Sequence, residues 1–297
     1  MLSTRKRFLF IFVCAALVLF PAKSFADSVL YGITLDDNLL KISISPTAVS
    51  ATLIGQLDTV ASGGSASLGI GALGGNLYVY DQNAQVLREV SSTDASTIAT
   101  INLGITNTGE GDLAFAPNGT GYLVSTVDAE GDFGSTGAMY SFNTSGSPAN
   151  LITDNLSAQL DGLAFNSTGS GFGLEQGGAN LDSITTAGVI SAIGETGITG
   201  CDGSPCSLGG LAFGGTTLYA ALANFANSTS DFYTINPTTG AATFIGDIPF
   251  DQISGITAAP SSVPPVPEPS SVVPMAGAAL AIVLRHRWSS LGKAKPN

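Results

Sequence analysis

Histidine is almost absent from this chain of 297 residues. Its one histidine, His286, lies near the C-terminus, beyond the long central part of the sequence. A catalytic triad or a histidine metal site needs an imidazole inside the folded body. The sequence therefore excludes Ser-His-Asp and Cys-His chemistry, and histidine metal ligands, for residues 27–260.

Cysteine is scarce as well, with three in the whole chain. Cys201 and Cys206 flank a short polar segment, and in an oxidising compartment this pair predicts a small disulfide. Because the closed loop is short, its entropic contribution would be only about 2 kcal/mol. A metal pair or a redox dithiol is the alternative, but no further cysteine or histidine lies nearby to complete a zinc site.

Basic residues are missing from the same central part, where only Lys41 and Arg88 occur. Of the 22 acidic residues, all but Glu268 lie there, which gives residues 27–260 a formal charge of −19. Nucleic-acid binders need basic patches that attract phosphate. Nucleic acid is therefore excluded as a partner, and anionic lipid headgroups are repelled by this body.

The N-terminal residues 1–26 have the pattern of a signal peptide for the Sec export machinery. A basic segment, residues 5–7, precedes the apolar run 8–20, and small residues at Ser24 and Ala26 predict cleavage after Ala26. A membrane anchor is the alternative, but this run is shorter than the roughly 20 residues that a spanning helix needs. A lipoprotein site at Cys14 is rejected because residues 11–13 lack a small residue.

The C-terminal end has three parts in a fixed order. Residues 261–271 form a linker rich in proline and serine, residues 272–284 are apolar, and Arg285 and Arg287 follow them. The linker ends in the motif Val266, Pro267, Glu268, Pro269, Ser270. Basic residues after an apolar run favour a cytoplasmic position for that end, with the acidic body outside.

This end resembles the PEP-CTERM sorting signal of exported bacterial proteins, which membrane proteases of the exosortase class recognise. The resemblance implies an exosortase-type partner, transient insertion of residues 272–297 in the inner membrane with the body in the periplasm, and later residence at the cell surface or in an extracellular polysaccharide matrix. The apolar run departs from the pattern by its length, about 20 Å as a helix against a hydrocarbon core of roughly 30 Å. Membrane insertion is thus expected to be brief or shallow. A buried core helix or a disordered tail is the alternative.

The body, residues 27–260, contains an internal repeat. Its clearest copies are Leu113-Ala114-Phe115, Leu163-Ala164-Phe165 and Leu211-Ala212-Phe213, and its weaker copies are Gly71-Ala72-Leu73 and Ile256-Thr257-Ala258. Their last residues are 42, 50, 48 and 45 positions apart. This period is that of a four-stranded propeller blade.

These repeats predict an all-β fold, a β-propeller of about five four-stranded blades. The copy at residues 256–258 has no second strand after it, whereas the mature N-terminus begins with strands at residues 30–33, 39–42 and 52–55. A mixed blade made from both ends would close the ring and remove exposed strand edges. Six blades remain open if residues 55–69 contain a strand pair, and a β-sandwich is the alternative architecture.

Carboxylates supply the only candidate ligands in the body. Asp128, Glu130 and Asp132 alternate along one segment and could bind calcium, the one candidate cofactor, although the EF-hand pattern is absent. A solvated loop is the favoured interpretation. Asp112 and Asp161 are expected at equivalent points beside the first strands, as a polar ring or as turn caps, and the tyrosines are expected between blades.

Three function classes fit these observations. The leading one is a non-catalytic structural or binding protein of the cell surface or matrix. The second is a propeller that binds calcium or glycan. The third is a carboxylate-dependent enzyme acting on glycans, which needs two acids about 5 to 10 Å apart.

Overall fold

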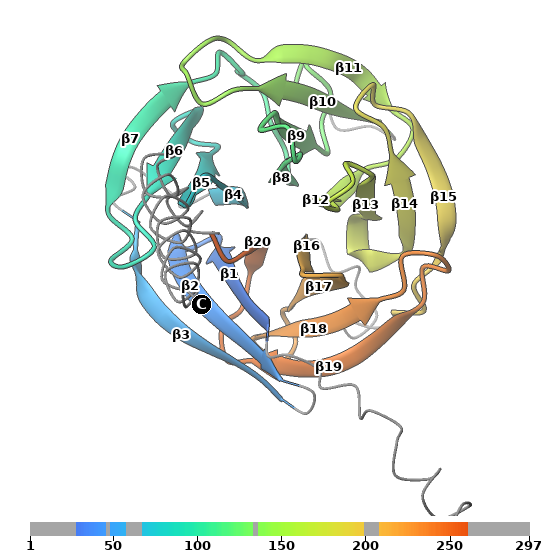
Figure 1. Ribbon diagram of the computed structural model, residues 1–297. Helices are drawn as coiled ribbons and strands as arrows, with labels where there is room; N and C mark the ends of the chain where they lie inside the picture. The colour runs from blue at the N-terminus through green and yellow to red at the C-terminus, as the bar shows by residue number, and fades with distance from the viewer. Residues whose placement is uncertain (1–27, 46–47, 58–66, 133–135, 199–207, 261–297) are drawn as a thin grey trace, which may run out of the picture. The chain divides into compact units, whose positions relative to one another are not determined.

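The computed structural model describes residues 28–45, 48–57, 67–132, 136–198 and 208–260. Within these ranges the chain forms twenty strands and one 3-10 helix, η1 (Gln176–Gly178). The strands make five antiparallel sheets of four, arranged as blades around a central axis (Figure 1). The predicted propeller of five blades is therefore confirmed, and the β-sandwich is wrong. No helix among the described residues has the length and apolar character of a membrane span.

Four blades are each built from consecutive strands. Two of these blades consist of β4 (Ser67–Leu73), β5 (Asn76–Asp81), β6 (Val86–Val90) and β7 (Thr97–Asn102), and of β8 (Gly111–Phe115), β9 (Gly121–Ser125), β10 (Gly137–Phe142) and β11 (Asn150–Leu156). The third consists of β12 (Leu160–Phe165), β13 (Gly171–Glu175), β14 (Asn180–Ile184) and β15 (Ile190–Glu195). The fourth consists of β16 (Gly209–Gly214), β17 (Thr217–Asn224), β18 (Thr229–Ile235) and β19 (Ala242–Ile248). In each blade the first strand is innermost and the fourth forms the rim (Figure 1).

The fifth blade joins the two ends of the described chain. Its strands are β20 (Ile253–Ala258), β1 (Ser28–Thr34), β2 (Asn38–Ser45) and β3 (Ala48–Gln56), in that order. The antiparallel pairing runs from Leu30 opposite Ala258 to Thr34 opposite Ile253. The predicted closure by both termini is confirmed.

Aromatic rings pack neighbouring blades together at three of the interfaces. Phe115 at the end of β8 contacts Tyr78 of β5 edge to face, with ring centroids 5.3 Å apart. Tyr122 and Phe165 contact each other with tilted rings at 5.0 Å, and Phe172 and Phe213 make a further edge-to-face contact at 5.5 Å. Burying such pairs stabilises beyond their area alone. The tyrosines on these strands belong to the core, as predicted.

One repeat was aligned wrongly from the sequence. Gly71 of β4 lies opposite Tyr78, as Ala114 of β8 lies opposite Tyr122. The weak first copy is therefore shifted by one residue, and Ile70 is the equivalent of Leu113. β4 also carries a register shift between Leu68 and Ile70. Residues that are equally spaced in the sequence therefore need not occupy equivalent positions in their blades.

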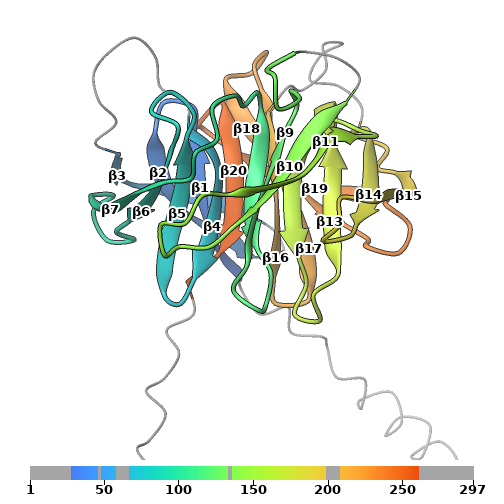
Figure 2. The same cartoon turned by 90° about the horizontal axis from the view of Figure 1, so that it is seen from above.

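Strand direction gives the ring two different faces. The innermost strands and the third strands begin at one face, and the second and fourth strands end there, because neighbours are antiparallel. We call this the acidic face, for the residues described below. At the other face β1 begins with Ser28 and β20 ends with Ala258, so we call it the tail face. Figure 2 shows the ring from the side, with loops at both faces.

Candidate functional site

Carboxylates gather at one end of the ring. Most of those in the described residues lie on the loops or strand ends of the acidic face: Asp36, Asp37, Asp81, Glu110, Asp128, Glu130, Asp132, Asp154, Asp161, Glu175, Glu195, Asp231, Asp247 and Asp251. The exceptions among described residues are Glu89 and Asp94 toward the tail face, Asp182 near the middle of β14, and Asp112 at the axis. Such a one-sided distribution focuses negative potential on the acidic face.

The one ion pair of the described residues stands at the edge of this face. Arg88 of β6 donates from Nε and Nη2 to Oδ2 of Asp81, at 3.0 and 2.8 Å, and both side chains are buried. Asp81 Oδ1 accepts the backbone N–H of Ala84. Two charge-assisted hydrogen bonds to one desolvated oxygen fix the geometry of this pair. The only arginine of the described body is therefore consumed by the fold.

A single buried carboxyl group, that of Asp112, links the innermost strands at the axis of the ring. Asp112 has no exposed surface. Its Oδ2 accepts the backbone N–H of Leu163 at 3.0 Å and of Leu211 at 3.3 Å, and its Oδ1 accepts that of Leu113 at 2.8 Å. The N–H of Ile70 also donates to this carboxyl group. One side chain thus bonds the innermost strands of four blades.

Burial raises the pKa of Asp112 well above its usual value, and the backbone N–H donors partly offset that rise by favouring the charged form. Glycine occupies the matching position in the other four blades: Gly69, Gly162, Gly210 and Gly255. A Cβ atom added to Gly255 would lie 2.5 Å from the Cα of Gly69. The innermost strands approach too closely there for further side chains.

The predicted equivalence of Asp161 and Asp112 is wrong, so the two do not form a polar ring, which was the less favoured of the two interpretations. Asp112 aligns with Gly162, because both precede the leucine of the repeat, so Asp161 lies one residue nearer the acidic face. Asp161 is 1% exposed. Its Oδ2 accepts the N–H of Gly177 at 3.1 Å, while its Oδ1 has no hydrogen-bond partner among the described residues.

Glu110 lies at the acidic face, directly before β8, and interacts electrostatically with Asp161. Desolvation raises the pKa of Asp161 well above its usual value, and the negative charge of Glu110 raises it further. Desolvation also raises the pKa of Glu110, although Gln176 opposes the shift by donating to Oε2 at 2.9 Å. Both carboxyl groups therefore resist ionisation, and the charge of one acts on the other.

A second pair of interacting carboxyl groups, Asp182 and Glu175, lies in the β12–β15 blade, which also contains Asp161. Burial raises the pKa of Asp182 to about 6, and Glu175 adds to the rise by its charge and a hydrogen bond. Asp182 is 1% exposed, and its Oδ2 has no partner among the described residues. Asn180 donates to Oε2 of Glu175. Perturbed carboxyl pairs are candidate acid and base groups, although structural networks produce them too.

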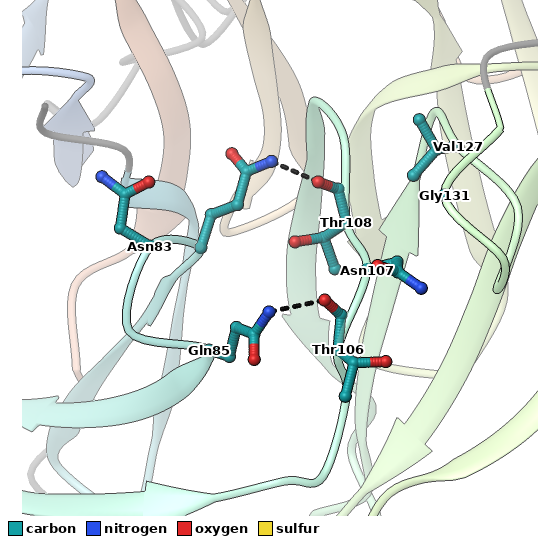
Figure 3. A pocket seen from close by; sticks show the side chains of 8 residues that line it. Asn83, Gln85, Thr106, Asn107, Thr108, Val127 and Gly131 are labelled. Atoms are coloured by element: carbon teal, nitrogen blue, oxygen red, sulfur yellow. Dashed lines mark hydrogen bonds between the residues drawn. The ribbon is translucent and has the colours of Figure 1, made fainter.

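A cavity of about 430 Å³ opens on the acidic face between two neighbouring blades (Figure 3). Its described lining residues are Gln82, Asn83 and Gln85 of the β5–β6 turn, Thr106, Asn107 and Thr108 before β8, and Val127 and Gly131 after β9. None of these carries a charge, and Val127 is the one apolar side chain. This volume lies in the range of small-molecule sites.

Hydrogen bonds between the blades hold the cavity walls together. Gln82 donates from Nε2 to the carbonyl oxygen of Thr108, and Gln85 donates to that of Thr106 (Figure 3). Asn107 donates to the carbonyl of Ala129 at 2.9 Å. The side chain of Thr108 also bonds the phenol of Tyr80, whose pKa burial raises to about 12. The cavity is therefore built into the packing of two blades.

The predicted calcium ligands form part of a loop on this face. Asp128 Oδ1 accepts the backbone N–H of Glu130 at 3.1 Å and of Asp132 at 2.8 Å. The carboxyl group thus stabilises its own turn, as in an Asx turn. Across the described ranges, no group of three or more acidic, cysteine or histidine side chains is placed to hold a metal ion. Calcium at this loop stays a prediction.

The remaining predicted sites lie outside the described residues. They are the cleavage site at Ala26, the pair Cys201 and Cys206, the motif Val266 to Ser270, and Arg285 with Arg287. The domain bounds at 1–26, 261–271 and 272–297 fall there as well. These assignments stay predictions.

Sequence reasoning missed the lining of the cavity. A signal was present, because the turn of residues 82–85 carries three amide side chains, those of Gln82, Asn83 and Gln85. The concentration of acidic residues after second strands and before first strands also predicts the acidic face, once strand direction is considered. Neither pattern involves a known motif.

No family model and no curated protein matches the sequence. Among solved structures, a chain of the nidogen/laminin complex is 10% identical with a TM-score of 0.49, over 80% of this chain and 99% of that one. A catalytically inactive virginiamycin B lyase from Staphylococcus aureus, solved with quinupristin, is 13% identical with a TM-score of 0.38, over 76% and 71%. A Bacteroides thetaiotaomicron protein of unknown function is 17% identical with a TM-score of 0.43, over 72% and 57%. The fold assignment rests on the strand pairing of this chain itself.

Proposed function

We propose that the protein is exported, processed by an exosortase-type protease, and used as a non-catalytic binding or structural component of the cell surface or extracellular matrix. The support from sequence is the leader of residues 1–26 and the sorting-signal resemblance at residues 266–287. The inner membrane would hold residues 272–297 until cleavage. Neither signal contributes a strand to the described ring.

The pairing of β1 with β20 is the observation that carries this proposal. The ring is completed between Ser28 and Ala258, so both proposed cuts fall outside it. Removal of either end would leave every described blade with four strands. A body that is closed before its processing sites can be released without exposing a strand edge.

The position of the two ends also supports a surface role. The described chain begins at Ser28 and ends at Pro260, both at the tail face. The acidic face and its cavity lie at the opposite end. A body attached through its tail face would present to an anionic membrane surface the end with fewer carboxylates, which lowers electrostatic repulsion. The acidic face would remain accessible to other molecules.

Intact mass spectrometry tests the processing. In cells that contain the exosortase, we expect mature protein that begins at Asp27 and ends near residues 267–269. Glu268→Ala should retain the full tail, whereas Glu195→Ala, a control on the acidic face, should be processed normally. A full-length tail on the unaltered protein would contradict the proposal.

A carboxylate-dependent enzyme is the second candidate, and the raised pKa of Asp182 favours it, although Asp182 and Glu175 are hydrogen-bonded and thus closer than the two acids of a glycosidase. The raised pKa of Asp182 would keep that group protonated at mildly acidic pH, as a general acid requires. Release of reducing ends from extracellular polysaccharide should then occur, and Glu175→Gln should abolish it. If the unaltered protein releases none, this candidate is rejected.

A further inference from the structure

We propose that the cavity between the β4–β7 blade and the β8–β11 blade binds an uncharged, hydroxyl-rich ligand, a segment of a neutral polysaccharide. This inference rests on the proposed function for the source of the ligand, which is the surrounding matrix. Its physical basis is independent of sorting, because it lies in the lining of the cavity.

The lining offers paired donors and acceptors without charge. Amide side chains present both N–H and C=O groups, and threonine hydroxyls do the same with one atom. Gln82 and Gln85 each use a side-chain N–H to hold the opposite wall, so their Oε1 atoms remain as acceptors. Sugar hydroxyls are donors and acceptors as well, and a row of them matches such a surface.

The surroundings of the cavity select against anionic ligands. Asp81 precedes Gln82, Glu110 follows Thr108, and Asp128 adjoins Val127. Within the described residues near the cavity, Arg88 is the one cation, and it is already paired with Asp81. Asp81 is therefore neutralised, but Asp128 and the other carboxylates of the acidic face would still repel an anionic polymer, whereas they would not repel a neutral one.

The same lining disfavours a peptide. Peptide recognition in grooves uses apolar pockets for alternate side chains or a free sheet edge. Val127 is the one apolar side chain among the described lining residues, and the strands beside the cavity are paired within their blades. A saccharide needs neither feature.

The walls are held in place before a ligand arrives. The glutamine bonds join the β5–β6 turn to the segment before β8, and Asn107 joins that segment to the β9–β10 loop. A preformed site avoids the entropic cost of ordering its side chains during binding. Removal of one of these bonds should therefore weaken binding by more than the loss of a single ligand contact.

Calorimetry on the full chain in mild detergent tests the proposal. Maltohexaose and cellohexaose are the neutral probes, and hexagalacturonate is the anionic probe. We expect saturable binding of at least one neutral probe and none of hexagalacturonate. Gln82→Ala and the shape-conserving Thr106→Val should each weaken binding about tenfold or more, which corresponds to about 1.4 kcal/mol.

Asn166→Ala, on the tail face, is the matched control and should bind as the unaltered protein does. Melting curves establish that each variant is folded. The proposal is overturned if neither neutral probe binds at millimolar concentration, if both cavity variants bind normally, or if hexagalacturonate binds more tightly. Failure of binding leaves the processing result unchanged, and a retained tail leaves the binding result unchanged, so the two proposals fail separately.

Discussion

The two faces of the ring use the same amide side chains for different purposes. On the tail face, Asn118, Asn143 and Asn166 each accept the backbone N–H of the residue two positions later, and so stabilise their own turns. On the acidic face, Gln82 and Asn107 donate to carbonyl groups of other loops. These three asparagines of the tail face therefore act within their own turns, whereas Gln82 and Asn107 of the acidic face join segments distant in sequence.

Charge follows the same division. The tail side carries Glu89 and Asp94 among the described carboxylates, and Asp94 bonds the N–H and the hydroxyl of Ser96 in its own turn. The acidic face holds most of the others, and desolvation raises the pKa values of two of them, Glu110 and Asp161, with the charge of Glu110 adding to the rise of Asp161. Carboxyl groups with perturbed pKa values are typical of functional sites, although structural networks produce them too.

Removal of the Asp112 carboxyl group should destabilise the innermost strands, which support both faces. Asp112→Leu would leave backbone N–H groups of four innermost strands without their acceptor. We expect the free energy of unfolding in urea to fall by about 3 to 5 kcal/mol. Glu195→Ala, an exposed control, should change it by less than about 0.5 kcal/mol. An unchanged stability of Asp112→Leu would show that water or other groups satisfy the axis.

Removal of the buried cation should damage the acidic face next. Arg88→Met leaves Asp81 desolvated with no positive partner, and we expect a loss of about 3 kcal/mol in urea unfolding. The double variant Arg88→Met with Asp81→Leu removes both charges, so it should recover part of that loss. If the double variant is less stable than the single one, the pair does not act through charge.

The contrast explains what the sequence could predict. The Leu-Ala-Phe repeat predicts the blades, because inner strands alternate and each phenylalanine packs against the next blade. Asn-x-Thr turns such as that of Asn166 are also visible, because their bonds span a few residues. The different roles of Asp112 and Asp161 could not be predicted, because a shift of one residue decides which carboxyl group reaches the axis. The cavity could not be predicted from the sequence either, because its walls come from three separate loops.

The pH dependence of the free energy of unfolding should reveal the raised pKa of Asp182 in the β12–β15 blade. The pKa of Asp182 is about 6 in the folded protein, against roughly 3.9 in an unfolded chain. The folded state binds this proton more tightly, so its stabilising contribution is complete below about pH 4 and is lost as the pH rises to about 6. Asp182→Asn should remove this part of the decline. Parallel curves for the two proteins in urea unfolding between pH 4 and 7 would contradict the raised pKa.

The smallest effect compares one amide from each face directly. Asn166→Ala removes an acceptor for the N–H groups of Thr168 and Ser170, at 3.0 and 2.9 Å, and should cost about 1 kcal/mol in urea unfolding. Gln85→Ala removes an exposed side chain of the cavity and should cost less stability than that. Saccharide binding should respond in the opposite order, lost with Gln85→Ala and unchanged with Asn166→Ala. If both variants lower stability and binding together, the two faces are not separate in function, because then a local turn would control a distant cavity.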